Sequence, residues 1–298
     1  MSNTKKIKFI TDSAGDFPKS FVQEKNIDVL PLHVYLKPYD GEMQEYLDGV
    51  NLDPDELFAF MEENKGTVST SQITAYDIEQ YFRSLAEKNE YDTYIMTCIS
   101  GVASPTYTNA KVALSNLKEE GVHLDVRLID TKFYTICYYY AMKDGIEAYE
   151  RGASADEIVK IIEDCCYSNN IFLANGTLEY LKRGGRITGF SALMGNILNI
   201  KPILTVKDGL IAPQEKVRGI KKAMSRIMEL VKEATKEGGY RYMIVYSNKA
   251  EYYDDFVRLV HETFSGEEIT ENQVGGTIGV HIGPGLVGLM FQKKTKNR

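Results

Sequence analysis

Three short turns in the sequence gather hydroxyl side chains near predicted strand ends and helix starts. They are Thr11-Asp12-Ser13, Thr70-Ser71-Gln72 and Ser104-Pro105-Thr106-Tyr107. Ser and Thr hydroxyls donate hydrogen bonds to a carboxylate or a phosphate without adding charge. Helix N-termini offer free N–H groups, and open α/β sheets bind ligands beyond the carboxyl ends of their strands. The turns are therefore candidates for an anion site, although each taken alone is also typical of ordinary helix capping.

One histidine stands out because a tight turn follows it. His281 is expected at the end of a strand over residues 277–281, and only Ile282 separates it from the turn Gly283-Pro284-Gly285. The turn fixes the direction of the strand end, which favours a role in a site. A purely structural histidine remains the alternative.

Positive charge is concentrated in one segment of the second half. Residues 182–226 contain ten Lys or Arg and two acidic residues, a net charge of +8, whereas the rest of the chain carries −15. This asymmetry suggests a face for a phosphate, an anionic lipid surface or an acidic protein. A solvated helix face over residues 218–226 is the plainer alternative. The uncharged run at residues 190–198 fits a helix on a membrane surface, a cover for an apolar ligand, or a core helix.

The sequence lacks the residue patterns that several common enzyme chemistries require. Asp12 follows the first predicted strand, where a nucleophilic aspartate of a phosphotransferase could stand. Such an enzyme would need a second carboxylate two residues later, and this chain has none there. No phosphate-binding loop and no local Ser-His-Asp context appear. The four histidines and four cysteines do not follow zinc-ligand spacing, so we expect neither a metal nor a cofactor. Buried free thiols are the simplest interpretation of Cys98, Cys137, Cys165 and Cys166.

The composition limits the class of protein. The chain has 298 residues, of which 43% are hydrophobic and 26% charged, and these are globular proportions. A net charge of −7 argues against a nucleic-acid-binding protein. No run of eighteen uncharged apolar residues and no signal-peptide core is present, so we expect a cytoplasmic protein.

Strand and helix patterns alternate along the first half. Strands are expected at residues 7–11, 29–36, 94–99 and 126–129, with helices following residues 17, 53, 72, 104 and 131. Asp53 before Pro54, and Ser104 before Pro105, each place a capping residue ahead of a proline at the first helical position. This order predicts a mostly parallel sheet covered by helices.

A domain boundary is predicted at Arg151-Gly152-Ala153, which gives an N-terminal α/β domain (1–153) and a C-terminal α/β domain (154–298). Ser154 and Glu157 have the spacing of a capping box at the start of the second domain. Asp208-Gly209 between apolar runs predicts a hairpin. The remaining strands are expected at residues 171–174, 242–246, 277–281 and 286–291, and helices at 177–182, 190–198, 217–236 and 250–264.

Taken together, these motifs resemble the DegV family, also known as the FakB-type fatty-acid-binding proteins. The resemblance covers nearly the whole chain and rests on seven motifs in family order. They are Ile10-Thr11-Asp12-Ser13, Thr70-Ser71-Gln72, Ser104-Pro105-Thr106-Tyr107, Ile129-Asp130-Thr131, the segment 181–187, the segment 200–203 with Asp208-Gly209, and the segment 281–285.

The resemblance implies a two-domain α/β fold with a long-chain fatty acid in a buried tunnel between the domains. It implies that Thr70 and Ser104 bind the carboxylate, and that Arg186 and His281 lie near the head group. It also implies a carrier without turnover of its own. The carrier presents the carboxylate to a fatty acid kinase, and the acyl phosphate enters phospholipid synthesis.

The resemblance further places Arg218, after Lys216, at a position implicated in partner contact. Together with Lys182 and Arg183, these residues are our candidates for contact with the kinase or, transiently, with a membrane surface.

Four departures from the family pattern involve five positions. Pro105 stands for a usual Gly, Ile73-Thr74 for Pro-Ser, Thr131 for Ser and Ile282 for Thr. The first two adjoin the implied carboxylate site, so they could alter its geometry or its chain selectivity. Two other functions remain open at this point. One is an α/β enzyme acting on a small phosphorylated or carboxylated substrate, and the other is a regulatory module that only senses a lipid.

Overall fold

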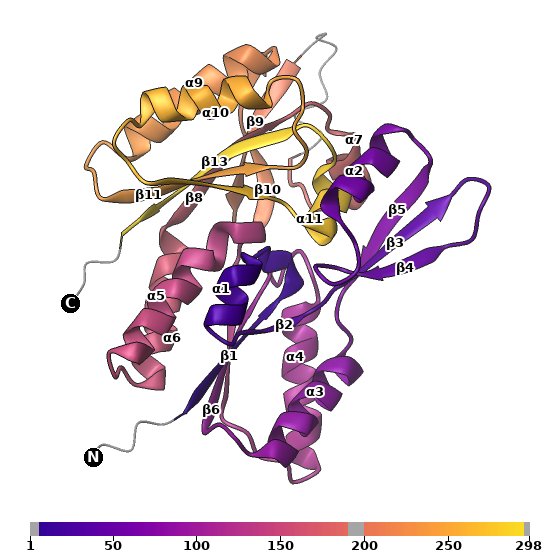
Figure 1. Cartoon of the computed structure of the whole chain (residues 1–298), viewed down its shortest axis with the longest axis vertical. Helices are drawn as coiled ribbons and strands as arrows, with labels where there is room; N and C mark the ends of the chain where they lie inside the picture. Colours follow the sequence, from indigo (N-terminus) through magenta and orange to yellow (C-terminus); the bar gives the residue numbers. More distant parts are fainter. Residues whose placement is uncertain (1–5, 190–199, 295–298) are drawn as a thin grey trace. The chain divides into compact units, whose positions relative to one another are not determined.

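The structure is a computed structural model that describes residues 6–189 and 200–294. The chain forms two compact units, each assembled from two separate stretches. Unit 1 takes its described residues from Met1–His33 and Ser71–Tyr167. Unit 2 takes its described residues from Val34–Thr70 and Ser168–Arg298. Each unit contains its own sheets and helices, so the predicted α/β class is confirmed for both (Figure 1).

Unit 1 is built on a parallel sheet of four strands. In sheet order these are β2 (Asp28–Leu30), β1 (Ile7–Asp12), β6 (Thr93–Cys98) and β7 (Val126–Asp130). Every residue of the two central strands is buried, as is usual for a parallel sheet with helices on both faces.

The helices of unit 1 lie on the two sides of this sheet (Figure 1). On one side are α3 (Ala75–Lys88) and α4 (Thr106–Glu119). On the other side are α1 (Lys19–Glu24), α5 (Tyr139–Glu150) and α6 (Ala155–Ser168). Two short 3-10 turns, η1 (Ser13–Gly15) and η2 (Thr135–Tyr138), complete the unit.

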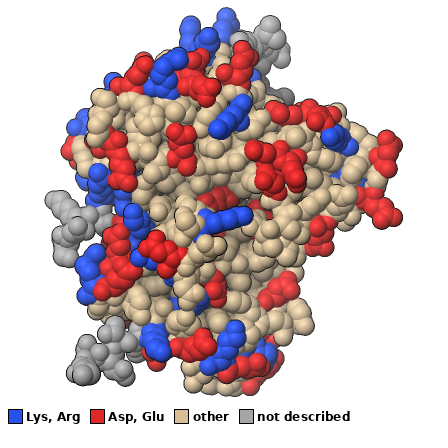
Figure 2. Space-filling view, viewed as in Figure 1, with Lys and Arg blue, Asp and Glu red and all other residues tan. Residues whose placement is uncertain are grey.

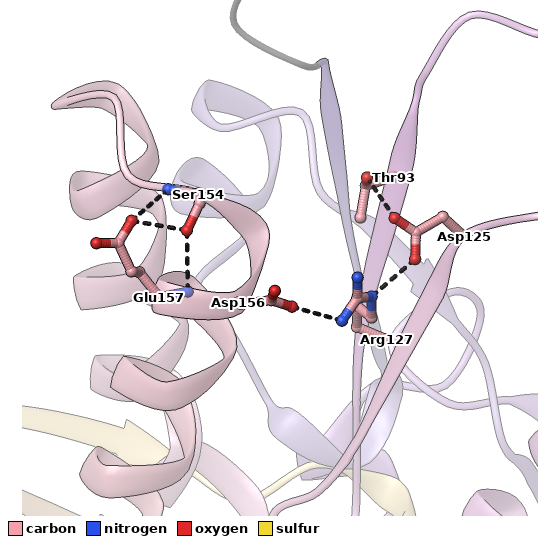
Figure 3. Close-up of polar contacts among 6 residues, drawn as sticks. All are labelled: Thr93, Asp125, Arg127, Ser154, Asp156 and Glu157. Atoms are coloured by element: carbon pink, nitrogen blue, oxygen red, sulfur yellow. Dashed lines mark hydrogen bonds and ion pairs between the residues drawn. The ribbon is translucent and has the colours of Figure 1, made fainter.

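The observed division of the chain differs from the predicted boundary after Ala153 because α6 belongs to unit 1. Asp156 on this helix pairs with Arg127 of β7 at 2.6 Å (Figure 3). Ile162 packs close to Gly145 of α5, where a Cβ atom would lie 2.6 Å from its Cγ1. These contacts fasten α6 to strand β7 and to helix α5, and a local composition change at 151–153 could not reveal them.

The capping box predicted at the start of α6 is present (Figure 3). The backbone N–H of Ser154 donates to Glu157 Oε2 at 2.8 Å, and the N–H of Glu157 donates to Ser154 Oγ at 3.4 Å. The helix start was therefore predicted correctly, although the domain boundary placed there differs from the observed division.

Unit 2 contains a large mixed sheet. Its strands, in sheet order, are β10 (Leu210–Arg218), β9 (Ile200–Lys207), β8 (Asn169–Asn175), β13 (Leu286–Lys293), β11 (Tyr240–Tyr246) and β12 (Ile269–Gln273). All neighbours are antiparallel except β11 and β12. The predicted hairpin is present, since Asp208 and Gly209 between β9 and β10 both have positive φ, at 50° and 80°.

Helices α9 (Ile220–Ala234) and α10 (Tyr253–Thr263) cover one face of this sheet (Figure 1). Their apolar stripes join the side chains of the strands in one core, which includes Ile227, Phe256 and Leu289, all with no exposed surface. The helices and the sheet of unit 2 therefore share one hydrophobic core.

A smaller part of unit 2 is formed by the stretch Val34–Thr70. It contains a three-stranded sheet, in the order β4 (Gln44–Leu47), β3 (His33–Pro38) and β5 (Gly66–Ser71), and helix α2 (Pro54–Glu62). As predicted, Asp53 caps α2 by accepting a hydrogen bond from the N–H of Asp55 at 2.8 Å. Among the described residues, the remaining helices of unit 2 are α7 (Glu179–Gly184) and α11 (Gly276–Ile282).

The strand predicted at residues 277–281 is wrong, because this segment is helix α11. Its β-branched residues favour a strand by propensity. Close packing decides otherwise, since a Cβ atom at Gly279 would lie 2.9 Å from Phe58 Cζ of α2. Gly276 is equally crowded and donates its N–H to Asp48 Oδ1 at 2.8 Å. The two glycines allow a helix to approach α2, and this tertiary contact overrides local propensity.

Three smaller predictions also differ from the structure. The single strand expected at residues 29–36 is divided between β2 and β3, which lie in different sheets. Thr70-Ser71 ends strand β5 and does not form a turn. Val217 and Arg218 extend β10 by pairing with β9, and α9 starts only after Gly219, at φ 83°. The apolar helix predicted at residues 190–198 lies outside the described residues.

Candidate functional site

The structure joins two of the predicted site residues directly. Thr70 Oγ1, at the end of β5, lies 2.8 Å from Nε2 of His281 on α11. Both residues belong to unit 2, although 211 positions separate them in the chain. The hydrogen bond therefore depends on α11 packing beside the stretch Val34–Thr70.

The C-terminal end of α7 fixes the other side of the imidazole. A Cβ atom at Gly184 would lie 2.5 Å from Nδ1 of His281, so only glycine leaves room for the ring. Arg186 follows, and its Nη1 donates to the carbonyl of Gly184 at 2.6 Å. The motif Gly184-Gly185-Arg186 thus holds the histidine against Thr70.

His281 is neutral near physiological pH. Burial, and secondarily the nearby positive charge of Arg186, lower the pKa of His281 to about 4. Its Nδ1 is buried and has no hydrogen-bond partner among the described residues. A buried N–H without an acceptor is rare, so we place the proton on Nε2, which donates to Thr70 Oγ1. The hydroxyl proton of Thr70 is then free to be donated to a ligand.

Unit 1 contains a second hydrogen-bonded pair, formed by two hydroxyls at the start of α4. Ser104 Oγ lies 3.0 Å from Thr106 Oγ1 and accepts a hydrogen bond from the N–H of Thr106 at 3.4 Å. Pro105 has helical dihedral angles, and the helix itself begins at Thr106. The prediction of Ser104 as N-cap with Pro105 as the first helical residue is wrong, because Pro105 is itself the N-cap and its carbonyl accepts from the N–H of Asn109 at 2.8 Å.

Two carboxylates hold the turn that leads to Ser104. Asp12, which is completely buried at the end of β1, accepts a hydrogen bond from the N–H of Ile99 at 2.6 Å. Asp130, at the end of β7, accepts one from the N–H of Gly101 at 2.9 Å. The N–H of Ser104 then donates to the carbonyl of Ser100 at 3.0 Å. Both aspartates are therefore structural supports for the turn.

The hydroxyl turn after β1 serves structure within unit 1. Ser13 Oγ accepts a hydrogen bond from the N–H of Leu32 at 3.0 Å, and Thr11 Oγ1 accepts one from Thr97 Oγ1 at 3.1 Å. Asp12 also accepts a hydrogen bond from the Tyr138 hydroxyl at 2.9 Å. Of the three hydroxyl turns in the sequence, this one has its polar atoms occupied by neighbouring strands and loops.

The departures from the family pattern have identifiable local roles. Ile73 is buried, and its carbonyl accepts a hydrogen bond from Asn109 Nδ2 at 2.8 Å. Thr74 caps α3 by accepting from the N–H of Asp77 at 3.1 Å. Thr131 Oγ1 donates to a backbone carbonyl of β6 at 2.8 Å. Ile282 is buried at the end of α11. Each departure therefore fits the local packing.

The basic side chains of residues 182–226 do not form one uniformly positive surface, because some of them pair with acidic side chains. Arg226 is paired with Glu215 at 2.8 Å and with Glu229 at 2.7 Å. Over α9 and α10, Figure 2 shows Lys and Arg interspersed with Asp and Glu. Lys216 and Arg218 are both exposed, and neither forms an ion pair within the described residues. These two cations are therefore more available to a partner than Arg226.

Lys182 and Arg183, the other predicted contact residues, lie in the last turn of α7, and both are exposed. The Arg183 guanidinium lies 4.9 Å from the centre of the Tyr180 ring and 4.0 Å from Glu179. Arg183 is therefore partly engaged within its own helix.

The four cysteines are buried free thiols, as predicted. Among the described residues, no three His, Cys, Asp or Glu side chains gather in a way that could hold a metal ion. No helix in the described ranges has the length and apolarity needed to cross a membrane.

With this geometry in view, comparison with known proteins identifies the family. A family profile described as "Uncharacterised protein, DegV family" matches residues 6–294. The chain belongs to the DegV family. A DegV domain-containing protein of Clostridium acetobutylicum is 30% identical over 288 residues, which cover 96% of this chain and 98% of that protein.

Solved DegV structures share the fold. A fatty-acid-binding DegV family protein of Thermus thermophilus has a TM-score of 0.84 at 28% identity, covering 97% of this chain and 100% of that one. DegV of Bacillus subtilis, described as a fatty acid binding protein, has a TM-score of 0.83 at 26% identity, with coverages of 97% and 100%. Both of these DegV neighbours are thus described as fatty-acid-binding proteins.

Several residues that support the candidate site of this DegV protein were not predicted to do so from the sequence. Thr106 was noted only within its motif, and Gly184 only as part of a turn. Asp12 was considered as a nucleophile and Asp130 only as a strand end. A signal was available for Gly184, because paired glycines before an arginine indicate close backbone approach. The role of Asp12 depends on contacts with β6 and η2 that no local pattern contains.

Proposed function

We propose that this chain binds a long-chain fatty acid and presents its carboxylate to a partner fatty acid kinase, without turnover of its own. Thr70 and Ser104 would donate hydrogen bonds to the carboxylate, and Arg186 and His281 would lie near it. The tail would occupy a buried tunnel. The fatty-acid-binding relatives from Thermus thermophilus and Bacillus subtilis support the ligand class.

The observation that carries this proposal is the Thr70–His281 hydrogen bond at 2.8 Å. A neutral histidine that donates to Thr70 leaves the hydroxyl proton directed to an external acceptor. A carboxylate buried without hydrogen bonds would cost several kcal/mol, so such donors are needed. Neutral donors supply them without a fixed ion pair, which keeps the head group available for phosphorylation.

The tail would supply most of the affinity. Each buried methylene contributes about 0.8 kcal/mol, so a long chain outweighs the head-group hydrogen bonds. Because the hydroxyls of Thr70 and Ser104 would contact only the head group, they would distinguish fatty acids from other lipids of equal length.

Mass spectrometry of lipid extracted from the purified protein tests the ligand directly. We expect fatty acids to be recovered in near-stoichiometric amount, either after purification or after incubation with a fatty-acid mixture. Recovery of none under both conditions would exclude the carrier function. Incubation of the loaded protein with ATP alone should leave the acid unchanged, whereas a modified acid would indicate turnover by this chain.

The proposed contact with the kinase is testable at Lys216 and Arg218. Replacing both with Glu should reduce phosphorylation of the bound acid by a fatty acid kinase while leaving fatty-acid affinity unchanged. Lys232→Glu, an exposed change near the end of α9, is the matched control. Equal phosphorylation of all three proteins would remove this surface from consideration. Binding of the same variants to anionic vesicles would show whether these cations also contact a membrane surface.

A further inference from the structure

Thr106, the first residue of α4, is completely buried, and its hydroxyl lies 3.0 Å from Ser104 Oγ. Within the described residues, Ser104 Oγ is the one acceptor within hydrogen-bond distance of this hydroxyl. Capping does not involve this hydroxyl, because the N-cap of α4 is Pro105 and no side chain caps the helix. The buried hydroxyl of Thr106 is therefore a feature that capping does not explain.

The direction of the hydrogen bond between the two hydroxyls follows from burial. If Ser104 donated to Thr106, the proton of the Thr106 hydroxyl would be buried without an acceptor, at a cost of about 1–3 kcal/mol. If Thr106 donates to Ser104, every proton is either paired or left on the residue proposed to meet the ligand. Thr106 is thus the donor of the pair.

We propose that Thr106 is a positioning residue that makes Ser104 a donor toward the head group. Ser104 Oγ accepts two hydrogen bonds from Thr106, one from Oγ1 at 3.0 Å and one from the N–H at 3.4 Å. A hydroxyl oxygen has two lone pairs, so its remaining capacity is the donation of its own proton. This inference rests on the proposed function, in which Ser104 meets the fatty-acid carboxylate.

This arrangement has a consequence for specificity. An ionised carboxylate only accepts hydrogen bonds, and bonds to it are stronger than bonds to neutral groups. A preset donor therefore favours a fatty acid over the alcohol with the same chain. Thr106 would contribute to this preference without touching the ligand.

Three substitutions on α4 test the proposal, with stearate and stearyl alcohol as probes. Thr106→Val keeps the shape but removes the hydroxyl, and should weaken stearate binding about tenfold, with less than about a twofold change for the alcohol. Thr106→Ser restores the hydroxyl and should return stearate affinity to within about twofold of the wild type. Thr108→Val, at an exposed position of the same helix, is the matched control and should change neither affinity.

Two further measurements separate the possible failures. In a Ser104→Ala background, Thr106→Val should have no additional effect on stearate affinity, because its target is gone. A merely structural role would weaken both probes equally and persist in that background, which would overturn the inference. If the wild type binds stearate and Ser104→Ala weakens it while Thr106→Val does not, only the inference fails. If the wild type binds no stearate, the proposed function fails, and the inference fails with it.

Discussion

Two hydrogen-bonded pairs, Thr70–His281 in unit 2 and Ser104–Thr106 in unit 1, each orient one hydroxyl, but they do so with different partners. In each pair a partner, the partly buried His281 or the completely buried Thr106, donates to the hydroxyl that is proposed to meet the carboxylate. The partner of Thr70 is a histidine 211 positions away and can be protonated. The partner of Ser104 is two positions away and has no charge to gain.

This difference shows where each half of the proposed site can be disturbed. The unit 2 pair depends on the packing of α11 against α2 and α7, and on the protonation state of His281. The unit 1 pair depends on the turn that Asp12 and Asp130 hold from β1 and β7, the strands on either side of β6. Substitutions and pH should therefore act on the two pairs separately.

The largest expected effect concerns the support of the unit 1 pair. Asp12→Ala should lower the free energy of unfolding by about 4 kcal/mol, because it leaves the N–H of Ile99 and the Tyr138 hydroxyl buried without an acceptor. Ser13→Ala is the matched control. It removes one acceptor, for the N–H of Leu32, and should cost about 1 kcal/mol. Equal losses for the two variants in denaturant titrations would contradict a special role for Asp12.

The next effect separates the pairs by pH. The pKa of His281 is about 4 in the folded protein, against about 6.5 unfolded, so the unfolded state binds the extra proton between these values. Stability should fall by up to about 3 kcal/mol as the pH is lowered from 6.5 to 4. At lower pH both states are protonated at His281, and this contribution stays constant.

The reference for this measurement is His281→Gln, which has no group that titrates in the range. We expect the difference in unfolding free energy between wild type and variant to narrow as the pH falls toward 4. Parallel curves would show that His281 is not buried as a neutral side chain. Thr106→Val should show no such pH dependence relative to wild type.

The third effect tests the packing of the imidazole. Gly184→Ala should cost about 2 kcal/mol, because the new methyl group would lie 2.5 Å from His281 Nδ1. In a His281→Ala background the same change should stabilise by about 0.5–1 kcal/mol, as alanine normally does in a helix. A double-mutant cycle measures this reversal of sign, and additive effects would argue against the contact.

Much of the fold could be predicted from the sequence where local signals agree. Asp53-Pro54 and Ser154 with Glu157 mark real helix starts, and Asp208-Gly209 marks a real hairpin. The buried strands β1 and β6 were identified from their apolar runs. These features depend on capping chemistry, turn geometry and burial, all of which act over a few residues.

The errors lie where distant parts of the chain decide the structure. Residues 277–281 read as a strand, but Gly276 and Gly279 let them pack as a helix beside α2. The stretch Val34–Thr70 belongs to unit 2 because of that same contact. No periodicity in either segment could show this.

In the candidate site, too, local features could be predicted from the sequence and tertiary contacts could not. The Ser104–Thr106 pair is local, and its motif was visible in the sequence, although the role of Thr106 was not. Thr70 and His281 were named through a family resemblance, and their 2.8 Å contact comes from the tertiary structure.

The central claim is that both hydroxyls donate to the carboxylate of one bound fatty acid. The most direct test is the affinity for stearate of Thr70→Val, Ser104→Ala and the double variant, with stearyl alcohol as the head-group control. We expect each single change to weaken stearate binding about tenfold, because a hydrogen bond to a charged group is lost, and to leave alcohol binding within about twofold. The double variant should be weaker than either single variant. Wild-type stearate affinity in both single variants would contradict the account.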